Sequence, residues 1–148
     1  MKPAQQSLIT VAQTFRWEMG HRLPYHTSGC ENFHGHSYRM VVEITGYPME
    51  NGMVIDFYDI EDAVNPIIEE VDHAFMCSNN DHLTREFLLQ TGLKAVFVDF
   101  YATAENIALY FLNKIKVQLN HANLTHLKVR VYETEKEFAE VAVTLHQS

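Results

Sequence analysis

The chain has 148 residues, of which 47% are hydrophobic and 20% are charged, and its formal net charge is −8. This length and composition are typical of one folded domain with its own core, so we expect a single domain over residues 1–148 and exclude a disordered protein. The acidic balance, without any cluster of Lys or Arg, excludes proteins that bind nucleic acid or anionic membranes through a basic surface.

Neither a membrane anchor nor a disulfide framework is indicated. No apolar stretch approaches the roughly 20 residues that a membrane-spanning helix needs, and no apolar run of signal-peptide length stands near residue 1. Cys30 and Cys77 are the two cysteines of the sequence, too few for the disulfide scaffold of an exported domain. We therefore expect a cytoplasmic protein with both thiols reduced.

The first half of the chain predicts two strands and a helix. Ser7–Trp17 and Ser37–Thr45 are rich in β-branched and aromatic residues, as strands are, while the Gly, Pro and Ser of Gly20–Phe33 predict a long loop. Tyr58–Val71 repeats apolar residues at the spacing of an amphipathic helix, although Pro66 should bend it or remove a hydrogen bond.

The second half predicts one more helix and two closing strands. Asp72–Tyr101 shows no clear period and is expected to be mostly irregular. Thr103 is a suitable N-cap for a helix over Ala104–Asn120, and Leu127–Thr134 and Phe138–Leu145 have the composition of strands. The order ββααββ predicts an α+β fold.

Histidine supplies the sharpest functional signal. His34 and His36 are two residues apart and share one face if they open a strand, and an antiparallel neighbour would bring His21 across to them. Three neutral imidazoles are a typical catalytic zinc set that leaves a fourth position for water or substrate. Cys30 leaves two interpretations open: as fourth ligand it would close a structural site, and otherwise it is free to react.

Cys30 and the Asp72-His73 pair are candidate proton-transfer groups. A thiol close to a metal or a cationic imidazole readily forms a thiolate, which suits a base or nucleophile. The alternative interpretation is that Cys30 is a small buried hydrophobic residue. A carboxylate can orient an imidazole for acid–base chemistry, but the adjacent Asp72 and His73 need not bond each other.

Two acids are candidate substrate ligands. Glu133 shares a predicted strand face with Val129 and Val131, where an unpaired acid is costly. A flat ligand with two adjacent donors would satisfy this carboxylate; the alternative is a solvated acid at the strand end. Glu105 stands in the first turn of the predicted helix, where an acid also suits the helix dipole.

The sequence resembles the 6-pyruvoyl-tetrahydropterin synthase family, including its bacterial branch that makes 6-carboxytetrahydropterin for queuosine. The resemblance covers residues 10 to 145 and rests on motifs that occur in the family's order. They are Phe15-Arg16-Trp17-Glu18-Met19-Gly20-His21-Arg22-Leu23, Cys30-x3-His34-Gly35-His36-Ser37-Tyr38, Val54-Ile55-Asp56-Phe57, Asp72-His73, Thr103-Ala104-Glu105-Asn106 and Val131-Tyr132-Glu133-Thr134.

The resemblance implies a fold, a cofactor and an assembly. It implies the tunnelling fold, whose ββααββ subunits have an antiparallel sheet with two helices on one face and assemble around a central barrel. Homo-oligomers of this kind are commonly hexamers of two trimers with active sites between subunits. It also implies Zn²⁺ held by His21, His34 and His36.

The resemblance further implies a reaction and roles for residues. The substrate would be 7,8-dihydroneopterin triphosphate, with Cys30 as base, Asp72 and His73 as proton relay, and Glu133 as pterin anchor. Thr103 and Glu105 would lie near the bound pterin, and Arg22, Arg39 and His26 are candidates for the triphosphate. The predicted activity is that of a zinc-dependent lyase that yields 6-carboxytetrahydropterin, acetaldehyde and triphosphate.

Glu31 leaves the product open. Some relatives use a glutamate at this place instead of the cysteine and form 6-hydroxymethyl-dihydropterin for folate, and this chain has both Cys30 and Glu31. Glu31 is alternatively a solvated loop acid, and 6-pyruvoyl-tetrahydropterin is a third product of the family. Two other classes are a zinc hydrolase, whose His-Glu-x2-His motif is absent from the sequence, and a non-catalytic pterin- or zinc-binding subunit.

Overall fold

Two long strands form the centre of the fold, because apolar residues alternate along both of them. In the computed structural model, which describes residues 7–146, β1 (Ile9–His21) pairs antiparallel with β2 (His34–Gly46) over its whole length. The remaining ends of the predicted domain, residues 1–6 and 147–148, lie outside the described residues. The loop between these strands is shorter than predicted, since β1 continues to His21.

Two further strands extend the sheet beyond β2. β5 (Leu124–Tyr132) pairs antiparallel with β2, and β6 (Phe138–Thr144) pairs antiparallel with β5. On one face, alternate side chains of β1, β2 and β5 are buried and form most of the sheet's contribution to the core. We call this the covered face, and its opposite the outer face.

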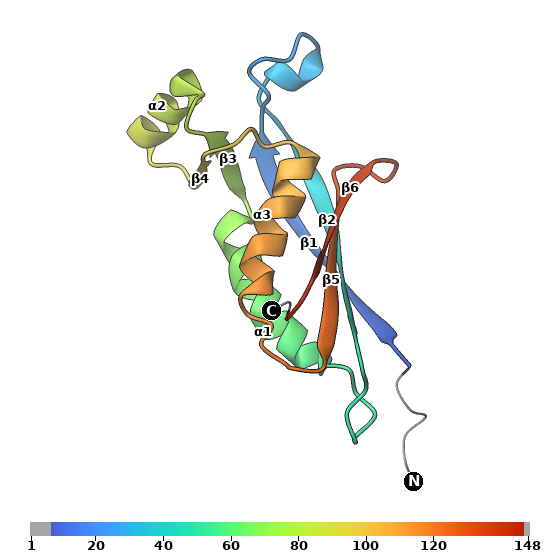
Figure 1. The fold of residues 1–148 in the computed structure, drawn as a ribbon. Coiled ribbons are helices and arrows are strands. Elements are labelled where there is room, and N and C mark those ends of the chain that lie inside the picture. The colour runs from blue at the N-terminus through green and yellow to red at the C-terminus, as the bar shows by residue number, and fades with distance from the viewer. Residues whose placement is uncertain (1–6, 147–148) are drawn as a thin grey trace.

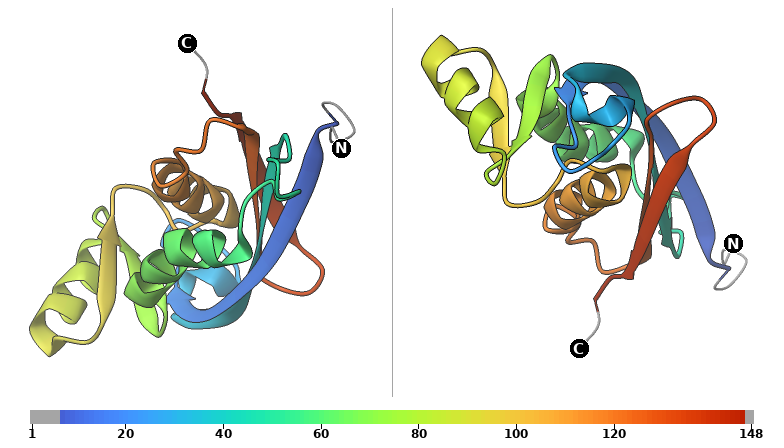
Figure 2. Two further views of the ribbon diagram at one scale, coloured as in Figure 1. Left: turned by 90° about the horizontal axis from the view of Figure 1, so that it is seen from below. Right: turned by 90° about the horizontal axis from the view of Figure 1, so that it is seen from above.

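Two helices pack on the covered face, as the views along the sheet in Figure 2 show. α1 (Phe57–Val71) continues through Pro66, and its N-cap Asp56 accepts a hydrogen bond from the backbone of Tyr58. α3 (Ala104–Lys116) begins after the predicted N-cap Thr103, whose hydroxyl accepts from the Asn106 N–H at 3.1 Å. Both helices bury one apolar stripe, as the 3.6-residue period predicts.

The prediction of an irregular stretch over Asp72–Tyr101 is wrong. This stretch contains β3 (Ala74–Ser78), α2 (His82–Thr91) and β4 (Ala95–Val98), and β3 pairs parallel with both β1 and β4. The strands are short and lack a clear alternation, and α2 buries only two of its residues, so neither period is visible in the sequence. The unit lies at one edge of the sheet (Figure 1), where β3 and β4 also contact α1.

The predicted α+β class is confirmed, with a correction to its details. The strand order is β4-β3-β1-β2-β5-β6, so the sheet is mixed instead of purely antiparallel, and a third α-helix joins the two predicted ones. None of the helices within residues 7–146 combines the length and apolarity needed to cross a membrane.

Candidate active site

Three histidines meet where β1 ends and β2 begins. His21 stands directly opposite His34 in the strand register, and His36 stands opposite Met19. Because side chains alternate between faces, all three imidazoles point to the covered face. One ring nitrogen from each lies within 4.8 Å of the others, so this histidine cluster can hold a metal ion.

Backbone carbonyls orient two of the rings. His21 Nδ1 lies 2.7 Å from the carbonyl oxygen of Ala102, just before α3, and His34 Nδ1 lies 2.8 Å from that of Asn32. A carbonyl oxygen can only accept, so each Nδ1 carries the proton and each Nε2 keeps a free lone pair. This support is typical of metal-binding histidines, whose second nitrogen bonds a backbone carbonyl.

Burial disfavours the charged form of two of the three rings, His21 and His36. Desolvation, opposed by the hydrogen bond to Ala102 and assisted by the other two histidines, lowers the pKa of His21 to about 4. Desolvation and the neighbouring His34 also lower the pKa of His36. The fully buried ring of Tyr38 lies edge-on to both, with ring centroids 6.1 Å from His21 and 5.5 Å from His36. Neutral imidazoles are the form that binds metal.

The spacing of the ring nitrogens fits zinc. Nε2 of His36 lies 3.1 Å from Nε2 of His21, and two ligands of a tetrahedral zinc site with bonds of 2.0–2.1 Å are about 3.3 Å apart. Two lone pairs that face each other at this distance repel unless a proton or a cation lies between them. The donor set and its geometry therefore fit a tetrahedral metal ion with one position left open.

A half-buried carboxylate borders the cluster. Glu133 follows β5 on the covered face, and its Oε1 lies 4.0 Å from Nε2 of His21. Desolvation, and next the charge of Glu105, raise the pKa of Glu133. Glu105 is exposed in the first turn of α3, beside the N-cap Thr103. The structure thus brings Glu133 to the histidines, with Glu105 close enough to influence its charge.

The two candidate bases occupy one short turn. The 3₁₀ helix η1 (Gly29–Glu31) lies in the loop between β1 and β2, with Cys30 half-buried and Glu31 exposed. The backbone N–H of Leu23 donates to the Cys30 carbonyl at 2.7 Å. In Figure 1 this turn is the small light-blue helix above the ends of the two strands that carry the cluster.

Asp72 and His73 form the pair that the sequence suggested, at the end of α1. Asp72 Oδ1 lies 3.0 Å from His73 Nδ1 and accepts the backbone N–H of Glu18 at 2.9 Å. The Glu18 N–H, and after it the bond to His73, hold the pKa of the Asp72 carboxyl below its usual range. His73 has a left-handed backbone with φ of 60° and a 76% exposed side chain, so its Nε2 is free to act on a partner.

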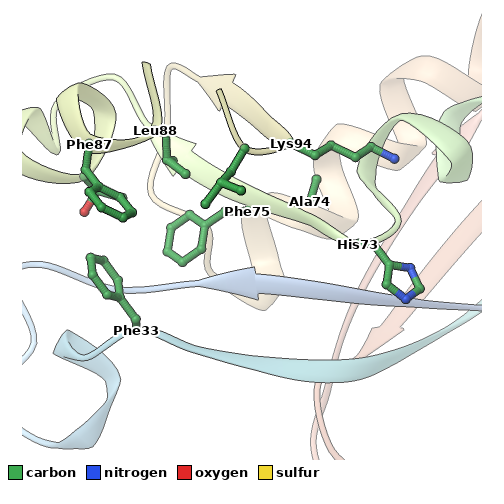
Figure 3. Close-up of a pocket in the computed structure, with 9 residues that line it drawn as sticks. Phe33, His73, Ala74, Phe75, Phe87, Leu88 and Lys94 are labelled. Carbon is green, nitrogen blue, oxygen red and sulfur yellow. The ribbon is translucent and has the colours of Figure 1, made fainter. Parts of the chain in front are cut away.

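His73 does not share a side of the sheet with the histidine cluster. It lines a hollow together with Glu18 and Ser37, whose side chains bond each other at 2.7 Å on the outer face. An adjoining apolar cavity of about 410 Å³ has His73 at one end and the rings of Phe33, Phe75 and Phe87 at the other (Figure 3). Asp72 and His73 thus pair with each other, but their side chains and those of the cluster lie on opposite faces of the sheet.

Comparison with known proteins assigns the family. The model of the family described as 6-pyruvoyl tetrahydropterin synthase matches residues 10–143. The chain belongs to the 6-pyruvoyl tetrahydropterin synthase family. A protein of Haemophilus influenzae named 6-carboxy-5,6,7,8-tetrahydropterin synthase is 32% identical over 141 residues, covering 90% of this chain and 98% of that protein. One of the same name from Aquifex aeolicus is 33% identical, covering 88% and 95%.

Solved structures of this family support the fold. An uncharacterized protein from Wolinella succinogenes, WS1659, has a TM-score of 0.79 at 21% identity and covers 92% of this chain and 98% of its own. The 6-pyruvoyltetrahydropterin synthase of Plasmodium vivax has a TM-score of 0.78 at 17% identity, with 95% and 100% covered. The tunnelling fold implied by the sequence motifs is therefore confirmed.

Several supporting groups of this family member were not predicted. Ala102 and Asn32 act through backbone carbonyls, which leave no signal in a sequence. Asp81 was missed because its segment was expected to be irregular, although an Asp three residues before Thr84 is an N-cap pattern. Arg22, a candidate for the triphosphate, instead forms a hydrogen-bonded ion pair with Asp81 at 2.7 Å.

Proposed function

We propose that the chain is a zinc-dependent lyase that converts 7,8-dihydroneopterin triphosphate and water to 6-carboxytetrahydropterin, acetaldehyde and triphosphate, a step toward queuosine. One observation carries the proposal: His21, His34 and His36 form a cluster that can hold a metal ion, and His21 Nε2 lies 4.0 Å from the half-buried carboxylate of Glu133. The family match supports the substrate class, and the names of the Haemophilus and Aquifex relatives favour this product.

Each described group has a task in this reaction. A pterin ring offers a ring N–H and an amino group side by side, and the Glu133 carboxylate can accept both. Thr103 and Glu105, at the start of α3, would lie near the bound ring. A zinc ion on the three histidines would supply a Lewis acid that makes the adjacent C–H of the substrate more acidic.

The proton transfers fall to the remaining residues. The Cys30 thiolate removes the activated proton, and His73, oriented through Nδ1 by Asp72, delivers or relays a proton from its exposed Nε2. Elimination releases triphosphate, and cleavage of the side chain then releases its two outer carbons as acetaldehyde. Both cysteines are free, which suits a cytoplasmic enzyme.

A second product has its own supporting observation. Glu31 follows Cys30 directly in the same turn, so η1 carries both candidate bases next to each other. A related Plasmodium vivax structure is described as a variant of a glutamate that is a catalytic residue. With Glu31 as base, the chain would form 6-hydroxymethyl-dihydropterin, and 6-pyruvoyl-tetrahydropterin is the third outcome that the test distinguishes.

The position of His73 supports an active site between copies of the chain. β1 pairs with β3 only at Met19 and Gly20, so its edge from Ile9 to Trp17 has no strand partner within residues 7–146. β6 is likewise an edge strand. Unpaired edges favour pairing with another chain, and we propose a homohexamer of two trimers in which a neighbouring chain supplies Asp72 and His73.

Product analysis tests the function. The zinc-loaded and the chelated protein are each incubated with 7,8-dihydroneopterin triphosphate, and the products are identified by mass spectrometry. We expect 6-carboxytetrahydropterin and acetaldehyde from the zinc-loaded protein alone. A different pterin as the main product would change the assignment within the family, and tight pterin binding without turnover would identify a non-catalytic subunit. Light scattering should give six times the mass of one chain.

A further inference from the structure

An ion pair joins the end of β1 to the start of α2. Nε of Arg22 donates to Oδ2 of Asp81 at 2.7 Å, and Nη2 donates to Oδ1 at 3.1 Å. Asp81 is 5% exposed and the Arg22 side chain 18%. Two parallel bonds fix the relative orientation of both groups, and loss of either partner leaves the other charge poorly compensated in a largely buried place.

The same guanidinium reaches the turn that carries both candidate bases. Nη1 of Arg22 donates to the carbonyl oxygen of Glu31 at 3.1 Å, while the next backbone N–H, that of Leu23, donates to the carbonyl of Cys30. Two consecutive peptide groups of η1 are thus held by two consecutive residues at the end of β1. Arg22 follows His21 directly, so the contact ties the turn to the histidine cluster.

The orientation of this turn decides which base can act. Neighbouring side chains of a 3₁₀ helix point about 120° apart, since it has three residues per turn. Cys30 and Glu31 therefore cannot both face the histidine cluster in one conformation of the turn. In the structure Cys30 is half-buried, whereas Glu31 is exposed.

We propose that Arg22 and Asp81 are positioning residues that hold the η1 turn with Cys30 toward the site, and that they thereby select Cys30 over Glu31 as the base. The selection of the base, and with it of the product, rests on the function proposed above. The positioning of the η1 turn does not depend on that function. Asp81 also accepts the N–H of Thr84 at 3.4 Å as the N-cap of α2, so the β3-α2-β4 unit supports the catalytic loop.

The first test measures how well the turn is held, without any turnover. Full-length, zinc-loaded protein is treated with iodoacetamide at pH 8, and labelling of each cysteine is followed by peptide mass spectrometry. In Asp81→Asn we expect Cys30 to react at least about threefold faster than in the wild type, because the released turn is more exposed. Glu70→Gln, which breaks an exposed pair with Lys114, should leave the rate unchanged.

Cys77 serves as the internal control for folding. It is 1% exposed in β3, and burial raises its pKa to about 11, so it should remain unlabelled while the β3-α2-β4 unit is intact. If iodoacetamide also labels Cys77 in Asp81→Asn, the β3-α2-β4 unit has opened in that variant. The positioning role is then tested with Arg22→Lys. A single ammonium can remain near Asp81 but cannot hold both its carboxylate and the Glu31 carbonyl, so the same acceleration at Cys30 is expected.

The second test measures the choice of base. With 7,8-dihydroneopterin triphosphate, we expect Asp81→Asn to shift the ratio of 6-hydroxymethyl-dihydropterin to 6-carboxytetrahydropterin upward by about tenfold. An unchanged Cys30 alkylation rate in a folded variant overturns the positioning role. A faster alkylation with an unchanged ratio overturns the selection of the base. Absence of turnover in the wild type refutes the proposed function instead, while the alkylation test still judges the positioning role.

Discussion

The two faces of the β1–β2 ladder differ sharply at the end where β1 stops. On the covered face, burial keeps His21 and His36 neutral and disfavours the charge of Glu133. On the outer face, Asp72 keeps its charge because the Glu18 N–H and His73 bond it, and His73 is largely exposed. The covered face is therefore suited to a metal and a flat ligand, and the outer face to proton exchange.

The backbone of the sheet separates these two faces, so each side chain lies on one face or the other. Residues of one strand alternate between its two sides, so the side chains of Glu18 and His21 point to opposite faces even though they are three residues apart. In the proposed hexamer, a second chain would bring its outer face, and with it His73, to a substrate bound at the histidine cluster.

The largest effect is expected on the covered face. His36→Ala removes one of three metal ligands, so zinc should fall well below one ion per chain and turnover should fall at least about 10³-fold. Metal analysis and product formation are measured on the same sample. His126→Ala is the control, because His126 is exposed and, within residues 7–146, its ring bonds the Thr125 hydroxyl alone. Full zinc retention in His36→Ala would falsify the assigned ligand set.

Mixing variants of the two faces tests whether they act across chains. His36→Ala and His73→Ala should each be inactive as pure oligomers. After joint refolding, random mixing gives about one quarter of the sites an intact cluster from one chain and His73 from another. We expect activity to return to that level in a turnover assay. A mixture no more active than its parents would place both groups of a site in the same chain.

The third prediction concerns the substrate anchor. Glu133→Gln loses a charged acceptor for two donors, worth about 2 kcal/mol, so kcat/KM should fall about 30-fold. In contrast to its lower activity, the Glu133→Gln variant should have a higher free energy of unfolding in urea than the wild type. Because its pKa is raised in the folded state, Glu133 favours folding only while protonated at low pH, and this contribution is lost as the pH rises through the folded pKa.

At pH 7 the metal-free Glu133→Gln variant should therefore be more stable than the wild type, and the gap should shrink as the pH is lowered. Comparison of the two urea midpoints at pH 7 and near pH 4 measures this. A variant that is less stable at pH 7 would contradict the cost assigned to the buried charge.

The smallest effect is expected at the corner that leads into His73. The Lys94 ammonium donates to the carbonyls of Glu69 and Asp72, at 2.8 and 2.6 Å, beside the C-terminus of α1. Lys94→Met should lower the free energy of unfolding by about 1 kcal/mol, measured with urea. Lys114→Met, which removes an exposed side-chain pair, should cost less. Equal losses in the two variants would argue against a specific role of Lys94.

The sequence by itself determined most of the covered face. A composition rich in β-branched and aromatic residues predicted β1, β2, β5 and β6, and their two-residue spacing predicted a shared face for His34 and His36 if they opened a strand. The 3.6-residue period, and Thr103 as N-cap of the second, predicted helices over Tyr58–Val71 and Ala104–Asn120. The structure has them at Phe57–Val71 and Ala104–Lys116. These features are local, since each depends on residues that are neighbours in the chain.

Only the tertiary structure decided the rest. β3 and β4 are too short to show a period, and their pairing depends on partners elsewhere in the chain. The bonds from His21 to the Ala102 carbonyl and from Arg22 to Asp81 span 81 and 59 residues, and the side of the sheet that His73 faces depends on how α1 meets β1. Such contacts arise from packing in space, which the order of residues along a chain does not display.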